Sequence, residues 1–173
     1  MLNFEFKKSG RKCIEDQKDF SPGEVFYSAL VETEEGGSER QDYCLEHWDE
    51  PPDECIGWWK AKVPELGKGK VFWAPRKVLL AYFEHALQSE QHQDIAFVAG
   101  LLLVQKKILV LDDDETDPRI MRLRNRLDKT GYDVPVFDVS GNRLSAIQAE
   151  LPERLFKDEP VDDFDDEEEE ANA

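Results

Sequence analysis

Residues 75–111 read PRKVLLAYFEHALQSEQHQDIAFVAGLLLVQKKILVL and contain the longest uninterrupted apolar run of the chain. That run, residues 95–104 (IAFVAGLLLV), has no polar side chain. A membrane-spanning helix needs about 20 apolar residues, and this run stops at Gln105 after ten. An element that is apolar on every face must be surrounded by the rest of a folded chain. We therefore expect residues 94–106 to form the central helix of a single core.

The segment before this run predicts a second helix that pairs with the central one. Pro75 suits the first position of a helix, and apolar residues then recur along one broad face up to about residue 90. The polar stretch 89–93 (SEQHQ) interrupts the pattern, and Asp94 is a suitable N-cap for the helix that follows. Residues 75–90 and 94–106 are therefore expected to form a helical hairpin.

The chain after this hairpin predicts a small antiparallel sheet and a C-terminal helix. Residues 108–139 contain β-forming runs separated by turn residues, and Pro135 places the last strand at a sheet edge. An amphipathic helix begins at Ser140 or Asn142, and Pro152 is expected to kink or end it. Together with a β-rich start, this order of elements predicts an α+β fold.

The first fifty residues predict a compact β module. Residues 2–7 alternate apolar and polar side chains, as a half-buried strand does. Residues 25–32 (VFYSALVE) predict a strand, and two glycines turn the chain back so that residues 40–44 (RQDYC) form its partner. Adjacent prolines in residues 49–53 (DEPPD) mark a connector. The expected organisation is a ribbon-like β module at residues 1–50, an α+β body at 51–157 and a tail at 158–173.

The negative charge of the chain is concentrated in its tail. The net charge is -17, and residues 158–173 contribute -10 because they contain ten acidic residues and no Lys or Arg. The remaining residues carry -7, which is ordinary for a soluble domain. An acidic, self-repelling segment that is poor in apolar residues is expected to be disordered.

The cysteines point to a reducing compartment. Cys13, Cys44 and Cys55 are an odd number of cysteines, which argues against a disulfide framework. The residues after Met1 lack the basic and apolar regions of a secretory signal, so the expected location is the cytoplasm. There the cysteines are free thiols or metal ligands.

The strongest candidate site combines cysteine and histidine at the end of the predicted hairpin. Cys44 and His47 have Cys-x2-His spacing, which lets one turn present both side chains to a metal ion. Cys13 precedes the hairpin, so the order of knuckle, hairpin and knuckle matches a zinc ribbon with Cys13, Cys44 and His47 as zinc ligands. The fourth ligand is either Asp16, three residues after Cys13, or Cys55, eight residues after His47.

A hairpin that folds without a metal is the alternative. The 27 residues between Asp16 and Cys44 exceed the usual separation of about 15–20 between knuckles. Aspartate is also an unusual ligand in a structural zinc site. The sequence leaves both readings open.

Three stretches of the sequence carry a resemblance to known proteins that agrees with the zinc-ribbon hypothesis. SPGEVFYSALVE (21–32), RQDYCLEHW (40–48) and IGWWKAKVP (56–64) resemble small uncharacterised bacterial proteins with a degenerate zinc-ribbon-like N-terminus. The resemblance covers about the first half of the chain and the helix that contains LLLVQKK. It implies no known activity, and it makes Cys13, Cys44 and His47 the positions of interest.

A segment rich in tryptophan and lysine is a weaker candidate for a functional site. Trp58, Trp59 and Trp73 lie among basic residues in the segment Trp58–Lys77, a mixture that single-stranded nucleic acids favour. The rest of the chain is acidic, however, whereas nucleic-acid readers usually carry a basic domain. Tryptophans mostly serve burial, so we expect these three tryptophans and Trp48 to form an aromatic layer between the β module and the helices. No nucleophile elbow, P-loop or dinucleotide-binding motif occurs.

The sequence therefore favours a small cytoplasmic protein without enzymatic activity, an adaptor or regulatory binding module whose partner is another protein. A small enzyme with a site near Cys44 and His47 is the alternative. A nucleic-acid binder that uses Trp58–Lys77 is a third reading. His85 and His92 are expected on solvated helix surface, and no membrane partner is expected.

Overall fold

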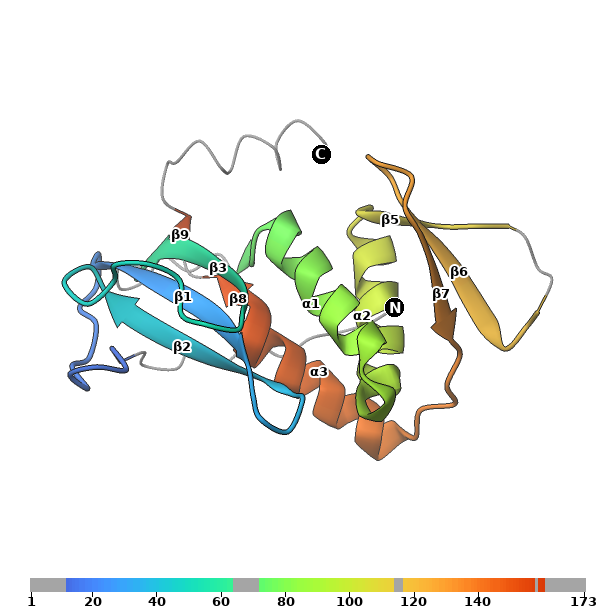
Figure 1. Cartoon of the computed structure of the whole chain (residues 1–173), viewed down its shortest axis with the longest axis horizontal. Coiled ribbons are helices and arrows are strands. Elements are labelled where there is room, and N and C mark those ends of the chain that lie inside the picture. Colours follow the sequence, from blue (N-terminus) through green and yellow to red (C-terminus); the bar gives the residue numbers. More distant parts are fainter. Residues whose placement is uncertain (1–11, 64–71, 114–116, 158, 161–173) are drawn as a thin grey trace.

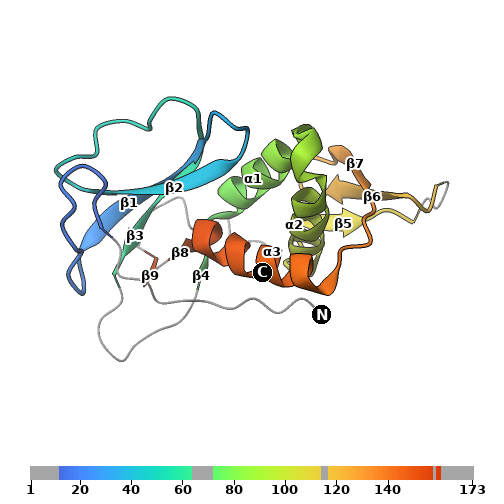
Figure 2. The ribbon, with the colours of Figure 1, turned by 90° about the horizontal axis from the view of Figure 1, so that it is seen from below.

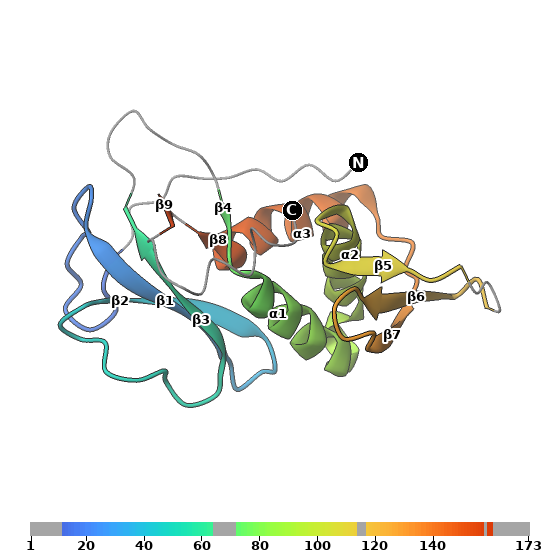
Figure 3. The ribbon, with the colours of Figure 1, turned by 90° about the horizontal axis from the view of Figure 1, so that it is seen from above.

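A computed structural model describes residues 12–63, 72–113, 117–157 and 159–160. Within these residues, a sheet, a group of helices and a second, smaller sheet follow one another along the long axis of the molecule (Figure 1). Views from below and above show the same order, with the helices between the two sheets (Figures 2 and 3). The predicted α+β class is confirmed, while the strand expected at residues 2–7 lies outside the described residues.

The N-terminal sheet is built on the predicted hairpin. β1 (Val25–Glu32) and β2 (Ser38–Cys44) pair in antiparallel register. β3 (Cys55–Lys62) pairs with the other edge of β1, so the sheet extends past the boundary at residue 50 that the sequence suggested. The short β9 (Glu159–Pro160) adds to β3. Two residues of the predicted disordered tail are thus paired, and the residues after Pro160 lie outside the described part.

The core extends from the inner face of this sheet through three described α-helices to the smaller sheet. α1 (Arg76–Gln88) and α2 (Gln93–Gln105) form the predicted helical hairpin, joined by a 3-10 turn at Glu90–His92. α2 buries seven of its thirteen residues and contacts α1, the smaller sheet and α3 (Gly141–Leu155). This arrangement makes α2 the central helix. Among the described helices, none combines the length and apolar character needed to cross a membrane.

Two glycines let the layers approach each other closely. A Cβ atom on Gly57 of β3 would lie 3.0 Å from Val78 Cγ1 of α1. A Cβ atom on Gly100 of α2 would lie 3.0 Å from Leu123 Cδ1. Because such contacts are tighter than normal packing, a larger residue at either position would push neighbouring side chains apart.

The C-terminal helix corrects one expectation. α3 continues through Pro152 and ends at Leu155, so the helix does not end at the proline. Proline costs the helix one backbone hydrogen bond, but Leu151 and Leu155 are buried in the core at 0% and 1% exposure. Their burial offsets that cost and holds the last turn in place.

The smaller sheet confirms the predicted meander. β5 (Leu109–Leu111), β6 (Ile120–Asn125) and β7 (Gly131–Pro135) are antiparallel in the order β5-β6-β7. Pro135 lies on the edge strand β7, as expected. A separate pair is formed by β4 (Phe72–Trp73) and β8 (Phe156–Lys157).

The tryptophans do not form a single layer between the sheet and the helices. Trp59 is buried at 2% exposure in the core, and Trp73 packs against that core. Trp58 is 43% exposed, because successive residues of a strand point to opposite faces. Trp48 joins Trp58 on this outer face. The prediction of one layer was therefore wrong for two of the four tryptophans.

Candidate metal centre

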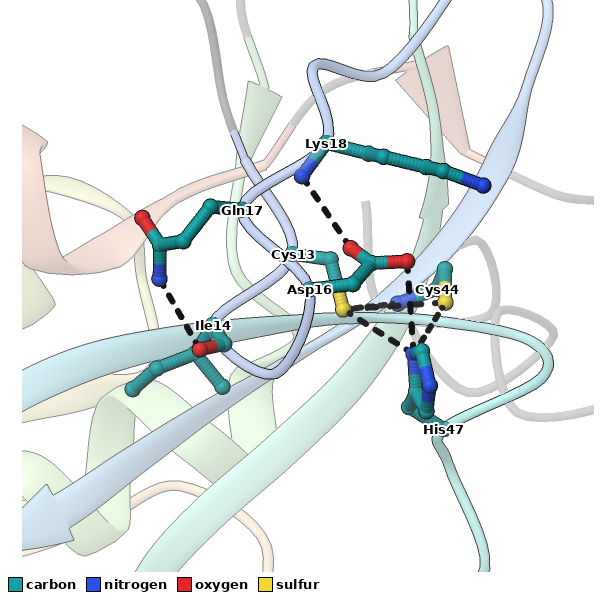
Figure 4. A network of polar contacts seen from close by, with 7 residues as sticks. All are labelled: Cys13, Ile14, Asp16, Gln17, Lys18, Cys44 and His47. Atoms are coloured by element: carbon teal, nitrogen blue, oxygen red, sulfur yellow. Dashed lines mark hydrogen bonds and ion pairs between the residues drawn. The ribbon is translucent and has the colours of Figure 1, made fainter.

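Two tight turns bring four donor side chains together beside the end of β2 (Figure 4). In the first turn, the N–H of Gln17 donates to the carbonyl of Cys13 at 2.9 Å, and the N–H of Cys13 donates to the carbonyl of Lys18 at 3.0 Å. Gln17 adopts a left-handed φ of 60° that closes the loop. The N–H of Ile14 donates to the carbonyl of Asp42 at 2.8 Å and ties the loop to β2.

The second turn continues directly from β2. Cys44 is the last residue of the strand, and its carbonyl accepts the N–H of His47 at 3.1 Å. This turn points both side chains toward Cys13, as the Cys-x2-His spacing predicts. The N–H of Cys44 also donates to Cys13 Sγ at 3.4 Å, a contact that favours the thiolate form.

The distances among the donor atoms approach those of a tetrahedron. Cys13 Sγ lies 3.6 Å from both Cys44 Sγ and His47 Nδ1, and Cys44 Sγ lies 3.0 Å from His47 Nδ1. Asp16 Oδ2 lies 3.7 Å from His47 Nδ1, and all four donors lie within 4.8 Å of one another. Tetrahedral zinc, with its bond lengths, separates its ligand atoms by about 3.3–3.8 Å. One ion at the centre would need only small side-chain shifts to reach all four.

Asp16, and not Cys55, belongs to this group of donors. One oxygen of the Asp16 carboxylate accepts the N–H of Lys18 at 3.1 Å, which leaves the other oxygen facing His47. The Cys55 thiol instead contacts the carbonyl of Gly57 at 3.3 Å. The sequence left open whether Asp16 or Cys55 is the fourth ligand, and the structure favours Asp16.

The surroundings of Cys13 and Asp16 favour the negative form of both side chains. Burial acts to raise the pKa of the Cys13 thiol, but backbone N–H groups, first that of Cys44, outweigh it and lower this pKa. The contact with Cys13 raises the pKa of the His47 imidazole. The N–H of Lys18 is the main cause that lowers the pKa of Asp16. A metal ion would displace protons from these donors, because thiolates and the neutral imidazole are the ligating forms.

The thiols suit ligation better than nucleophilic attack. Cys13 has no exposed surface, so a substrate cannot reach it. Cys44 is partly exposed, but burial and the contact with Cys13 raise its pKa. Reactive cysteines combine accessibility with a lowered pKa. Here Cys13 has the lowered pKa but is inaccessible, whereas Cys44 is accessible but has a raised pKa.

His85 and His92 are half-buried and line a cavity of about 460 Å³ between the β1–β2 turn and the helices. The expectation of solvated surface was wrong for both. His85 Nε2 lies 3.5 Å from Glu32 Oε1, and His92 Nδ1 lies 2.8 Å from Ser89 Oγ. Arg154 on the facing wall forms an ion pair on its own helix. Because these polar groups pair with protein atoms, the cavity does not indicate a ligand class.

The segment Trp58–Lys77 is divided between two faces and a stretch outside the described residues. Trp58 faces outward and Trp59 faces the core, while residues 64–71 are not described. Comparisons with known protein families, curated proteins and solved structures find no match for this chain. The four donor side chains are therefore the main guide to its function.

Proposed function

We propose that Cys13, Asp16, Cys44 and His47 bind one zinc ion, and that the protein is a non-enzymatic binding module built on the sheet that this ion stabilises. The observation that carries the proposal is the approach of four donor atoms to within 4.8 Å of one another. Two thiolates and an imidazole suit zinc better than magnesium or calcium, which prefer oxygen ligands. The ribbon-like order of knuckle, hairpin and knuckle supports the same choice.

A structural role agrees with the number of ligands. Catalytic zinc sites keep one position open for water or substrate, whereas structural sites are closed by four protein ligands. Here four side chains converge, so no position remains for a substrate. This supports an adaptor or regulatory module over an enzyme near Cys44 and His47. A site with two thiolates needs reduced cysteines, so the proposal places the protein in the cytoplasm.

The ion would join parts of the chain that are distant in sequence. Cys13 and Cys44 are 31 residues apart, and the first turn is also tied to β2 by the backbone hydrogen bond between Ile14 and Asp42. A shared ion would add a second, stronger link at the same place. Since zinc binds the folded site only, its binding free energy stabilises the fold.

Matched cysteine variants test the proposal. Cys44→Ser removes a proposed ligand, whereas Cys55→Ser removes a thiol of the same sheet that lies outside the group. Elemental analysis of the purified proteins should find about one zinc per chain in the wild type and in Cys55→Ser, and none in Cys44→Ser. Amide exchange at β2 and at the first turn should accelerate in Cys44→Ser alone.

Two results would contradict the proposal. One is equal zinc content in Cys44→Ser and the wild type. The other is a metal-free wild type whose β1–β2 amides remain as protected as those of the zinc-supplemented protein.

A further inference from the structure

The outer face of the N-terminal sheet carries an aromatic patch formed by Tyr27, Tyr43, Trp48 and Trp58. Trp48 stacks on Tyr27 with ring centroids 4.6 Å apart and an angle of 6° between the rings. Its ring also lies 5.4 Å from Tyr43 and 5.5 Å from Trp58. Ala29, which pairs with Trp58 in the register of β1 and β3, has no exposed surface. Trp48 therefore anchors the β2–β3 loop over the sheet.

Part of the aromatic patch remains open to solvent. Trp58 is 43% exposed. Lys60 Nζ already lies 5.8 Å from the centroid of the Tyr27 ring, an arrangement in which the ring attracts a cation. The exposed ring of Trp58 thus offers an aromatic face on which a basic side chain can pack.

The loop that carries Trp48 is strongly acidic. Residues 45–54 (LEHWDEPPDE) contain five carboxylates and no Lys or Arg, and we call them the acidic loop. All five carboxylate residues are exposed: Glu46, Asp49, Glu50, Asp53 and Glu54. A positive partner would be attracted to this loop, and a negative partner would be repelled.

We infer that the aromatic patch and the acidic loop bind a basic segment of another protein, with an arginine side chain stacked on Trp58. A guanidinium group stacks on tryptophan and forms paired hydrogen bonds with carboxylates, so it matches both halves of the surface. This inference rests on the proposed function, because it names the partner class of the binding module. The two are also linked in the chain, since His47 directly precedes Trp48.

The test uses the full chain and two synthetic nonapeptides, one alternating Arg with Gly and the other alternating Glu with Gly. Calorimetry and tryptophan fluorescence should show saturable binding of the arginine peptide that weakens with salt, and no binding of the glutamate peptide. Trp58→Ala should weaken binding by about tenfold, as expected for an aromatic residue at the centre of an interface. Trp58→Phe, which keeps an aromatic face, should recover most of that loss.

A matched control separates stacking from general charge attraction. Phe137→Ala removes an aromatic side chain of similar exposure, 40%, near the other sheet and should change binding less than twofold. The acidic tail can attract any basic peptide, so equal binding by Trp58→Ala and the wild type would overturn the inference. Preference for a single-stranded oligonucleotide over the arginine peptide would overturn it as well.

Zinc content measured on the same samples separates the two proposals. A chain without zinc that still binds the arginine peptide through Trp58 would support this inference and contradict the metal site. A chain with one zinc that shows no effect of Trp58→Ala would overturn this inference and leave the metal site intact.

Discussion

Substitution of Gly100 tests how closely α2 packs against α1 and the smaller sheet. A Cβ atom there would lie 3.0 Å from Leu123 Cδ1, 3.2 Å from Phe83 Cε2 and 3.3 Å from Met121 Cε, all closer than ordinary contact. Phe83 and Leu123 are buried at 0% and 1% exposure, so neither can move into solvent. These neighbours must therefore shift within the core.

The expected magnitude follows from two opposing effects. Replacing a helical glycine by alanine stabilises the helix by about 1 kcal/mol. Overpacking a close-packed core costs about 1–3 kcal/mol. For Gly100→Ala the two effects nearly cancel or leave a loss of up to about 2 kcal/mol. Gly100→Leu forces three further carbon atoms into the same space. The free energy of unfolding of this variant should therefore fall by about 1–3 kcal/mol relative to the wild type.

Urea denaturation followed by circular dichroism measures both variants. Gly141→Ala, at the first residue of α3 with no atom within 4 Å of an added Cβ, is the matched control and should be neutral or stabilising. If Gly100→Leu were as stable as the wild type, Gly100 would face open space. The assignment of α2 as the central helix would then be wrong.

Three further changes have defined outcomes. Deleting residues 161–173 removes an acidic segment poor in apolar residues and should leave the thermal midpoint within about two degrees; a drop of ten degrees in calorimetry would show that the tail docks. Asp94→Asn should lower stability at pH 7, because Arg143 lowers the pKa of Asp94. That stabilisation is lost as the pH falls through the lowered pKa of Asp94. The urea midpoints of variant and wild type should therefore converge at a pH well below 3.8, the ordinary pKa of an aspartate. A difference that stays constant with pH would contradict the ion pair. Tyr132→Phe removes the hydrogen bond that Tyr132 donates to Glu84 at 2.6 Å and should cost about 1–2 kcal/mol in chemical denaturation; an unchanged midpoint would show that the bond adds nothing.

The strength of each local signal explains how well the sequence predicted the fold. Ten consecutive apolar residues strongly favour burial, so the central helix was predictable to within a residue at each end. The helix does not end at Pro152, because the local effect of the proline is smaller than the stabilisation from the burial of Leu151 and Leu155 around it. The prediction of a single tryptophan layer failed because the face that each tryptophan occupies depends on strand register, which composition does not reveal.

The same reasoning applies to the candidate metal centre. The Cys-x2-His spacing predicted that Cys44 and His47 share a turn, because this contact is local. The choice between Asp16 and Cys55 depends on the left-handed backbone of Gln17 and on the bond from Ile14 to β2, and sequence spacing shows neither. His85 and His92 were placed on the surface because the sequence does not show that the β1–β2 turn lies over them.

Native mass spectrometry of the intact chain, with and without a chelator, tests the central claim most directly. The chain should carry the mass of one zinc ion, and chelation should remove that mass and broaden the charge-state distribution as the N-terminal sheet opens. A mass equal to that of the bare chain, with an unchanged charge-state distribution after added zinc or chelator, would contradict the metal site.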